Sequence, residues 1–207
     1  MSNADEERAI RCEMTRVLSS LNPEKRSDGV AGRLATLRKN AATDGRGAAR
    51  AWEDAIFLDD SHSPRITVRE QTANFVLGLF AVYQQGCSHF VHASGDASED
   101  RAKYRLGRVI GSLGDSEHSK QALIKGLERV VVADAGPTIY YRMRSLIQLL
   151  KSVSSRPPVD FVQLAVDLGR LQSGGQAAED VRFRWGRELH SSYKQNNTES
   201  EVQKEGK

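Results

Sequence analysis

The sequence predicts an all-α protein of eight or nine helices in two packed helical bundles. Apolar residues recur at spacings of three and four along most of the chain, and strand-like alternation is scarce. Polar segments rich in Gly, Pro and Ser separate these periodic stretches. We place the boundary between an N-terminal bundle, 4–91, and a C-terminal bundle, 100–193, in the small, polar segment 92–100. At 207 residues, the chain can bury a core without disulfides or metals.

Four helices are expected in the N-terminal half, at 4–20, 27–43, 48–58 and 66–85. Pro23 ends the first, and Ser27 or Asp28 is a suitable cap for the second. The helix over 66–85 is apolar around much of its circumference, so we expect it in the core.

Five helices are expected in the C-terminal half, at 100–113, 116–133, 137–154, 159–172 and 177–193. The sequence Arg156-Pro157-Pro158 separates two of them, because proline cannot continue a helix. The tail, 194–207, is polar and poor in apolar residues, so it is expected to be disordered.

Composition indicates a cytoplasmic protein with no membrane partner. No apolar run approaches the roughly 20 residues that cross a bilayer, and the N-terminus lacks a signal-peptide pattern. Cys12 and Cys87 are far apart in sequence and are expected to be free thiols. The chain holds 21 Arg and 9 Lys, and Arg is the better residue for bidentate phosphate contacts.

Motifs for catalysis are lacking. The sequence contains no P-loop, nucleophile elbow or HExxH motif. Cys87, His89 and His92 follow C-x-H-x-x-H spacing, which suits a metal site, but no fourth ligand is evident and loop histidines are the simpler interpretation. We therefore expect no enzyme activity, metal or cofactor.

Three predicted helices carry basic faces. In 100–113, Arg101, Arg105 and Arg108 lie opposite the apolar face, with Tyr104 beside them. Like charges at this spacing repel each other, and a polyanion would relieve the repulsion. A solvent-exposed face paired to acids elsewhere explains the pattern as well.

In 137–154, Arg142 and Arg144 flank the apolar stripe and are expected to reach in different directions, with Lys151 on the Arg144 side. In 177–193, Val181, Trp185 and Leu189 are expected to face the core, while Phe183 points outward. The arginines of this helix spread around the remaining surface at positions Arg182, Arg184 and Arg187.

Seven motifs occur in a characteristic order. They are GRLATLRKNA (32–41), FAVYQQG (80–86), YRLGRVIGSLG (104–114), GLERVVVAD (126–134), YYRMRSLIQLLKS (140–152), VDFVQLAVDLGRLQ (159–172) and VRFRWGREL (181–189). From about residue 15 to 193 the chain resembles the small-subunit family, CasB, of the type I-E CRISPR surveillance complex Cascade. The tail from Lys194 has no counterpart in the family pattern.

The resemblance implies an all-helical, non-catalytic subunit present in two head-to-tail copies. The implied partners are the repeated backbone subunits, the large subunit, a second copy of the chain, guide RNA and target DNA. Basic surfaces would help hold the target strand and the displaced strand after the guide has paired. The family motifs map this role to Arg33, Arg38, Lys39, Arg105, Arg108, Arg142, Arg144, Arg182, Arg184 and Arg187. Arg38-Lys39 stands where the family more usually has two arginines.

Two functions remain open for these arginines and for Arg101 and Lys151. In the first, they bind nucleic-acid backbone without reading bases, so binding is indifferent to sequence and sensitive to salt. In the second, the chain is a protein–protein scaffold whose arginines mainly form subunit interfaces. A basic groove joining 101–108, 142–151 and 182–187 would support the first, whereas arginines individually paired to acids would favour the second.

Overall fold

The computed structural model describes residues 2–25, 29–47, 53–58, 66–93, 101–113, 118–134 and 136–205, with backbone alone for 118–119 and 193–205. Within these ranges the protein is all-α, as predicted. Eight α-helices are present: α1 (Asn3–Ser20), α2 (Val30–Ala42), α3 (Val68–Gln84), α5 (Leu106–Ser112), α6 (His118–Val131), α7 (Pro137–Lys151), α8 (Phe161–Ser173) and α9 (Gly175–Glu205). A 3₁₀ turn covers Pro23–Lys25.

Local sequence sets the helix starts where two capping boxes form. Ser2 accepts a hydrogen bond from the Asp5 amide at the start of α1, and the Asp5 carboxylate bonds back to Ser2. Thr67 and Glu70 form the same reciprocal pair at the start of α3. Each box satisfies amides that have no partner within the helix.

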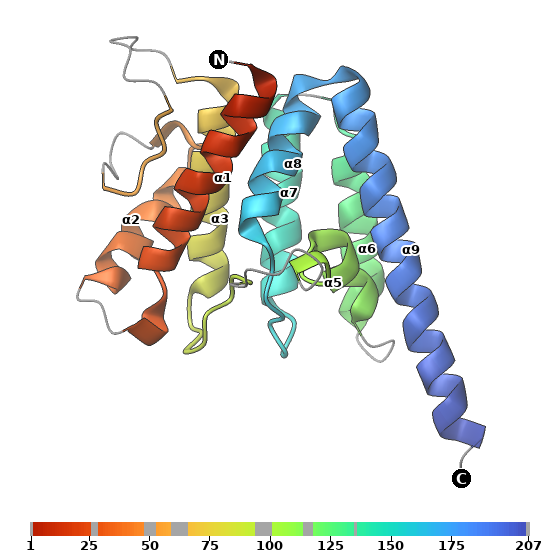
Figure 1. Cartoon of the computed structure of the whole chain (residues 1–207). Helices are drawn as coiled ribbons and strands as arrows, with labels where there is room; N and C mark the ends of the chain where they lie inside the picture. Colours follow the sequence, from red (N-terminus) through yellow and green to blue (C-terminus); the bar gives the residue numbers. More distant parts are fainter. Residues whose placement is uncertain are drawn as a thin grey trace.

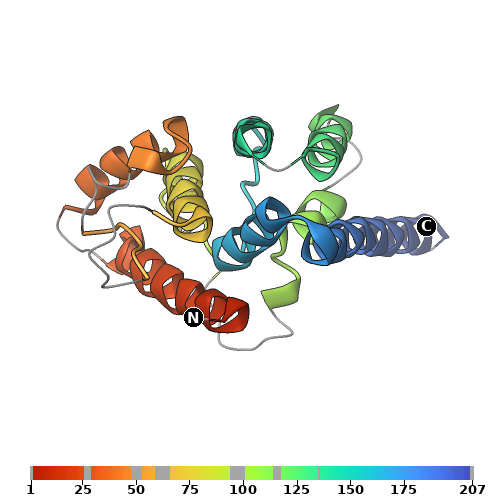
Figure 2. The same ribbon diagram turned by 90° about the horizontal axis from the view of Figure 1, so that it is seen from above.

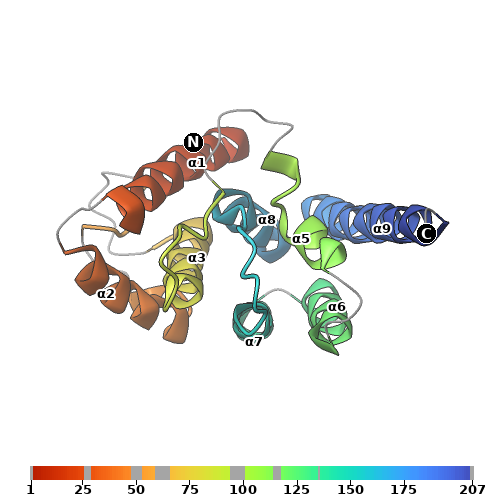
Figure 3. The same ribbon diagram turned by 90° about the horizontal axis from the view of Figure 1, so that it is seen from below.

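The helices surround one continuous apolar core. Helix α2 packs on α3, α6 packs on α7, and α5 packs on α9 (Figure 1). The views along the helix axes show α8 between α3 and α9, with α1 beside it (Figures 2 and 3). Ten consecutive residues of α3, Thr72–Ala81, are buried, as its apolar circumference predicts.

The core crosses the boundary predicted at 92–100. Helix α8 contacts α1 and α3 of the N-terminal half as well as α9 of the C-terminal half. Buried side chains form one cluster from Ile10 to Trp185. The division of the chain into two bundles therefore stays a prediction. The buried side chains of both halves belong to one core.

Glycine permits a close approach of α5 to α9. A Cβ atom at Gly107 would lie 2.9 Å from the carbonyl oxygen of Trp185, and one at Gly111 would lie 2.7 Å from that of Leu189. Both distances are shorter than non-bonded atoms allow. The glycines, one turn apart, therefore let α5 lie directly against the backbone of α9.

Three predicted boundaries are wrong. The helix expected over 100–113 is interrupted, because 101–102 are helical but 103–105 form a turn and a bend before α5 begins at Leu106. Helix α7 ends at Lys151 rather than 154. Helix α9 does not end at 193, since its backbone remains helical to Glu205, beyond the rest of the fold (Figure 1). Disorder of the tail in solution stays a prediction.

The helix predicted over 48–58 is wrong where the structure describes it. Residues 53–58 form a turn followed by irregular backbone, and 48–52 lie outside the described residues. The Asn74 side chain of α3 bonds both the amide and the carbonyl of Ile56, each at 2.9 Å. The Leu58 amide donates to Glu70 at 2.6 Å. These tertiary bonds replace the backbone bonds that a helix would need.

Candidate nucleic-acid interface

Within the described residues, half of the twelve cations predicted to bind nucleic acid already have a carboxylate partner. The pairs are Arg33–Asp54, Arg101–Asp160, Arg105–Glu188, Arg144–Asp44, Arg182–Glu179 and Arg184–Asp167. Four of these carboxylate side chains, those of Asp54, Asp160, Asp167 and Glu188, are at most 7% exposed. A buried carboxylate needs a nearby cation, so these arginines are part of the folded structure.

Arg33 illustrates this structural role. Its guanidinium bonds both carboxylate oxygens of Asp54 and donates to the Ser20 hydroxyl at 2.7 Å. The Asp54 hydrogen bond is the main reason that the pKa of Arg33 lies above its ordinary value. Arg33 thus ties α2 to the end of α1 and to the segment 53–58.

Other predicted arginines bond carbonyls near helix C-termini. Arg144 donates two bonds to the Ala41 carbonyl at the end of α2 and one to Asp44 at 2.6 Å. Arg182 donates to the carbonyls of Val131, at 2.8 Å, and Ala133, at 3.3 Å, at the end of α6. Cations are favoured at these electronegative ends.

Arg142 donates to the carbonyl of Arg129 in α6, whereas Arg144 reaches α2. The expectation that these two arginines reach in different directions from α7 is therefore confirmed. Both bonds are intramolecular, and neither needs a ligand.

A buried network joins α1, α8 and α9 around Asp167. Its carboxylate accepts from Arg184, from the Trp185 indole at 2.8 Å and from Gln163 at 2.5 Å. The side-chain oxygen of Gln163 accepts from Arg11 of α1 at 3.0 Å. Burial raises the pKa of Asp167, and the partners oppose this shift.

Glu188 continues the network toward α5. Arg105 donates to it at 3.3 Å, and the Arg184 Nε lies 3.9 Å from the same carboxylate. Its other oxygen, Oε2, is buried without a hydrogen-bond partner. Burial is the main cause that raises the pKa of Glu188. The predicted arginine faces of 101–108 and 182–187 therefore do meet, but around a shared buried acid.

The three candidate metal ligands contact other groups of the chain, two of them on Arg156 and the third on Val159. The Cys87 sulfur lies 3.0 Å from Arg156 Nη1, and His89 Nε2 lies 3.5 Å from the Arg156 carbonyl. His92 Nδ1 lies 3.2 Å from the Val159 carbonyl, and burial lowers the pKa of this histidine. Within the described ranges, no three His, Cys, Asp or Glu side chains could hold a metal ion.

Arg38, Lys151 and Arg156 form a cluster that we call the basic corner. Lys151 Nζ donates to the amide oxygen of Gln85 at 2.9 Å, and Arg156 donates to the carbonyls of Lys151 and Gln85 at 3.2 and 2.7 Å. The pKa of Lys151 is lowered first by partial burial and then by the charges of Arg156 and Arg38. No described carboxylate forms an ion pair with any of the three.

Four further predicted cations also lack a carboxylate partner within the described residues: Lys39, Arg108, Arg142 and Arg187. Lys39 and Arg187 are exposed, whereas the Nε of Arg108 is buried without a hydrogen-bond partner. Sequence reasoning missed Arg156 as a candidate, because Arg156-Pro157-Pro158 indicates only a helix break. Nothing in the local sequence shows that the ends of α3 and α7 meet there.

Similarity to known proteins was found at the level of family and fold. The profile of the family described as CRISPR-associated protein Cse2 matches residues 33–190. The crystal structure of CasB from Thermobifida fusca is 24% identical with a TM-score of 0.64, over 88% of this chain and 98% of that one.

The crystal structure of CasB from Thermus thermophilus is 20% identical with a TM-score of 0.58, over 86% of this chain and 97% of that one. A second crystal structure from Thermus thermophilus, of a CRISPR-associated protein of the Cse2 family, is 18% identical, with the same TM-score and coverage. No curated protein matches. No helix in the described part of the chain is long and apolar enough to cross a membrane.

Proposed function

The chain belongs to the CRISPR-associated Cse2 family of CasB-type Cascade subunits, and we propose that it binds nucleic-acid backbone as a non-catalytic subunit of type I-E Cascade. In this role it stabilises the pairing of guide RNA with target DNA and holds the displaced strand. Its partners are the other Cascade subunits, a second copy of the chain, guide RNA and target DNA. Such a complex acts in the cytoplasm.

The observation that carries this proposal is the basic corner. Its three cations lie close enough for Arg156 and Arg38 to lower the pKa of Lys151, and no described carboxylate neutralises them. Mutual repulsion makes such a cluster favour an anion, and each phosphate that it neutralises also releases counterions. Phosphate contacts fix the position of a strand without reading its sequence.

Nine of the twelve predicted cations then divide by role. Arg38, Lys39 and Lys151 are proposed to contact phosphates, while Arg156, whose guanidinium already bonds the carbonyls of Lys151, Tyr83 and Gln85, adds its positive charge beside them. Those paired to carboxylates are proposed to stabilise the fold: Arg33, Arg101, Arg105, Arg144, Arg182 and Arg184. Replacing Arg142 and Arg144 together would therefore be a poor test of DNA binding, because the end of α2 loses its partner at the same time.

The test compares Arg38→Gln/Lys151→Gln with wild type in binding to a single-stranded DNA oligonucleotide over a series of salt concentrations. Each lost phosphate contact should reduce the slope of log K against log salt by about 0.7, so the pair should lose about 1.4. Arg16→Gln is the matched control, since Arg16 is exposed and already paired with Glu13 at 2.8 Å. An unchanged affinity and slope in the double variant would count against the proposal.

The scaffold alternative rests on a different observation, the exposed large apolar side chains. Phe183 is 67% exposed, and Val132 is 73% exposed. Exposed apolar groups of this size mark contact surfaces when they gather. If the isolated chain bound no single-stranded DNA even at low salt, this alternative would be favoured.

A further inference from the structure

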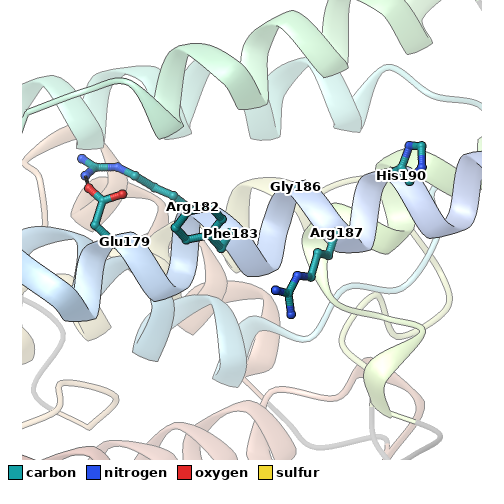
Figure 4. A pocket seen from close by; sticks show the side chains of 6 residues that line it. All are labelled: Glu179, Arg182, Phe183, Gly186, Arg187 and His190. Atoms are coloured by element: carbon teal, nitrogen blue, oxygen red, sulfur yellow. Dashed lines mark hydrogen bonds and ion pairs between the residues drawn. The ribbon is translucent and has the colours of Figure 1, made fainter.

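A hollowed surface follows α9, in the region that Figure 4 shows, and reaches α6. Two hollows, of about 430 and 200 Å³, lie along α9 and share Gly186 and His190. Phe183 and Arg187 line the first hollow, while Ile124 of α6 and Leu189 line the second. The two hollows therefore adjoin along α9, and we call them together the α6/α9 groove.

The groove is apolar and open. Phe183 is 67% exposed, and a Cβ atom at Gly186 would meet no heavy atom within 4 Å, so a notch lies one turn along the helix from the ring. Val132, 73% exposed, lies between the two α6-end residues whose carbonyls accept from Arg182, another lining residue. An aromatic ring, an aliphatic side chain and a notch are thus close together.

The open charge of the groove is positive. Among the described residues that line the two hollows, Glu179 is the one carboxylate, and Arg182 already pairs with it (Figure 4). Arg187 lies next to Gly186 and forms no ion pair within the described residues. An occupant with a carboxylate would therefore complement the groove.

We propose that this groove docks a segment of a neighbouring protein subunit that presents a large apolar side chain beside a carboxylate. The apolar group packs on Phe183 and enters the notch at Gly186, while the carboxylate pairs with Arg187. The mainly apolar lining and the single unpaired arginine favour protein over nucleic acid, for which the basic corner offers three cations. The proposal rests on the proposed function only in that the complex supplies the neighbour.

The first test measures the affinity of the full-length chain for Cascade assembled without it. Phe183→Ser and Arg187→Glu should each weaken binding about tenfold or more, as expected for a central aromatic contact and its charge partner. Tyr141→Ser is the matched control, because Tyr141 is equally exposed but lies on α7 outside the groove. The proposal is wrong if Phe183→Ser binds like wild type or if Tyr141→Ser loses as much affinity.

The second test identifies the occupant. Phe183→p-benzoylphenylalanine in the purified complex should crosslink, on illumination, to a protein segment that contains both acidic and large apolar residues. A crosslink to RNA or DNA, or to a basic segment, would overturn the proposal. Single-stranded DNA binding by the isolated Phe183→Ser chain should equal that of wild type. The DNA-binding measurement therefore tests the basic corner, while the Cascade-binding and crosslinking measurements test the groove, so the two proposals can fail independently.

Discussion

Replacing Arg144 with Ala separates a structural role from a nucleic-acid role at a residue that the sequence pattern assigned to nucleic acid. Arg144 makes two hydrogen bonds to the Ala41 carbonyl and one to Asp44, and its guanidinium carbon lies 5.8 Å from the centre of the Phe75 ring. Asp44 has a left-handed φ of 52°, which is uncommon for a non-glycine residue. The substitution removes all of these contacts at the end of α2.

The expected loss follows from the charge-assisted bonds. Hydrogen bonds to charged groups contribute about 1.5–3 kcal/mol, and here the Arg144 and Asp44 side chains are 24% and 31% exposed, so solvent screens part of the interaction. We expect the free energy of unfolding to fall by about 2 kcal/mol, which lowers Tm by about 4–8 °C in a protein of this size. Arg144→Lys keeps the charge but loses the planar guanidinium that donates two hydrogen bonds to the Ala41 carbonyl. It should therefore recover only part of the lost free energy of unfolding.

The assay combines urea and thermal unfolding, followed by circular dichroism, with single-stranded DNA binding at a temperature where every variant is folded. Arg144→Ala should lose stability and keep the wild-type DNA affinity. The reasoning would be refuted if Arg144→Ala unfolded like wild type and lost DNA affinity, because Arg144 would then be a phosphate contact.

Four other predictions concern packing, pH and the tail. Gly111→Ala should destabilise the fold by about 2–3 kcal/mol in urea unfolding, because its Cβ would lie 2.7 Å from a backbone oxygen of α9. Gly32→Ala, in open space on α2, should stabilise the fold by up to about 1 kcal/mol. The hydrogen bond from Arg170 lowers the pKa of Glu7 in the folded protein. The ionised Glu7 therefore stabilises the fold above the pKa that Glu7 has in the unfolded chain, and this stabilisation is lost as pH falls. Wild type and Glu7→Gln should therefore converge in stability in acid. Burial raises the pKa of Glu188, so its contribution is lost as pH rises, and Glu188→Gln should gain stability relative to wild type between acid and neutral pH. Deleting 194–207, which lies beyond the family match, should leave Tm unchanged within about 1 °C in thermal unfolding, and a larger fall would show that the tail packs on the fold.

Helix periodicity predicted most of the fold, because the buried side chains of each helix recur at helical spacing along the sequence. Val181 and Trp185 are buried and Phe183 is exposed, as the helical spacing of the last motif requires. The prediction failed where distant backbone competes for hydrogen bonds. The carbonyl of Tyr104 accepts from the Asp160 amide at 2.8 Å instead of continuing a helix, and no local pattern shows a bond between residues so far apart.

The arginines were harder to interpret for the same reason. A helical spacing shows which face Arg105 or Arg184 occupies, but the acids that neutralise them come from elsewhere in the fold. Both alternatives considered for the 100–113 face predict the same sequence pattern. Only the tertiary structure separates arginines that balance buried carboxylates from those, such as Arg38, that pair with none among the described residues.

Helix α8 has a mechanical consequence. Ten of its residues, from Phe161 to Leu171, are buried, and it touches helices of both halves of the chain. Swinging one half away from the other would expose this apolar surface to water, at about 25 cal/mol for each Å² uncovered. The basic corner and the α6/α9 groove are therefore held at a fixed spacing. The subunit should therefore move as one rigid body. Any movement between a strand at the basic corner and a neighbour at the groove, as proposed above, must then occur outside it.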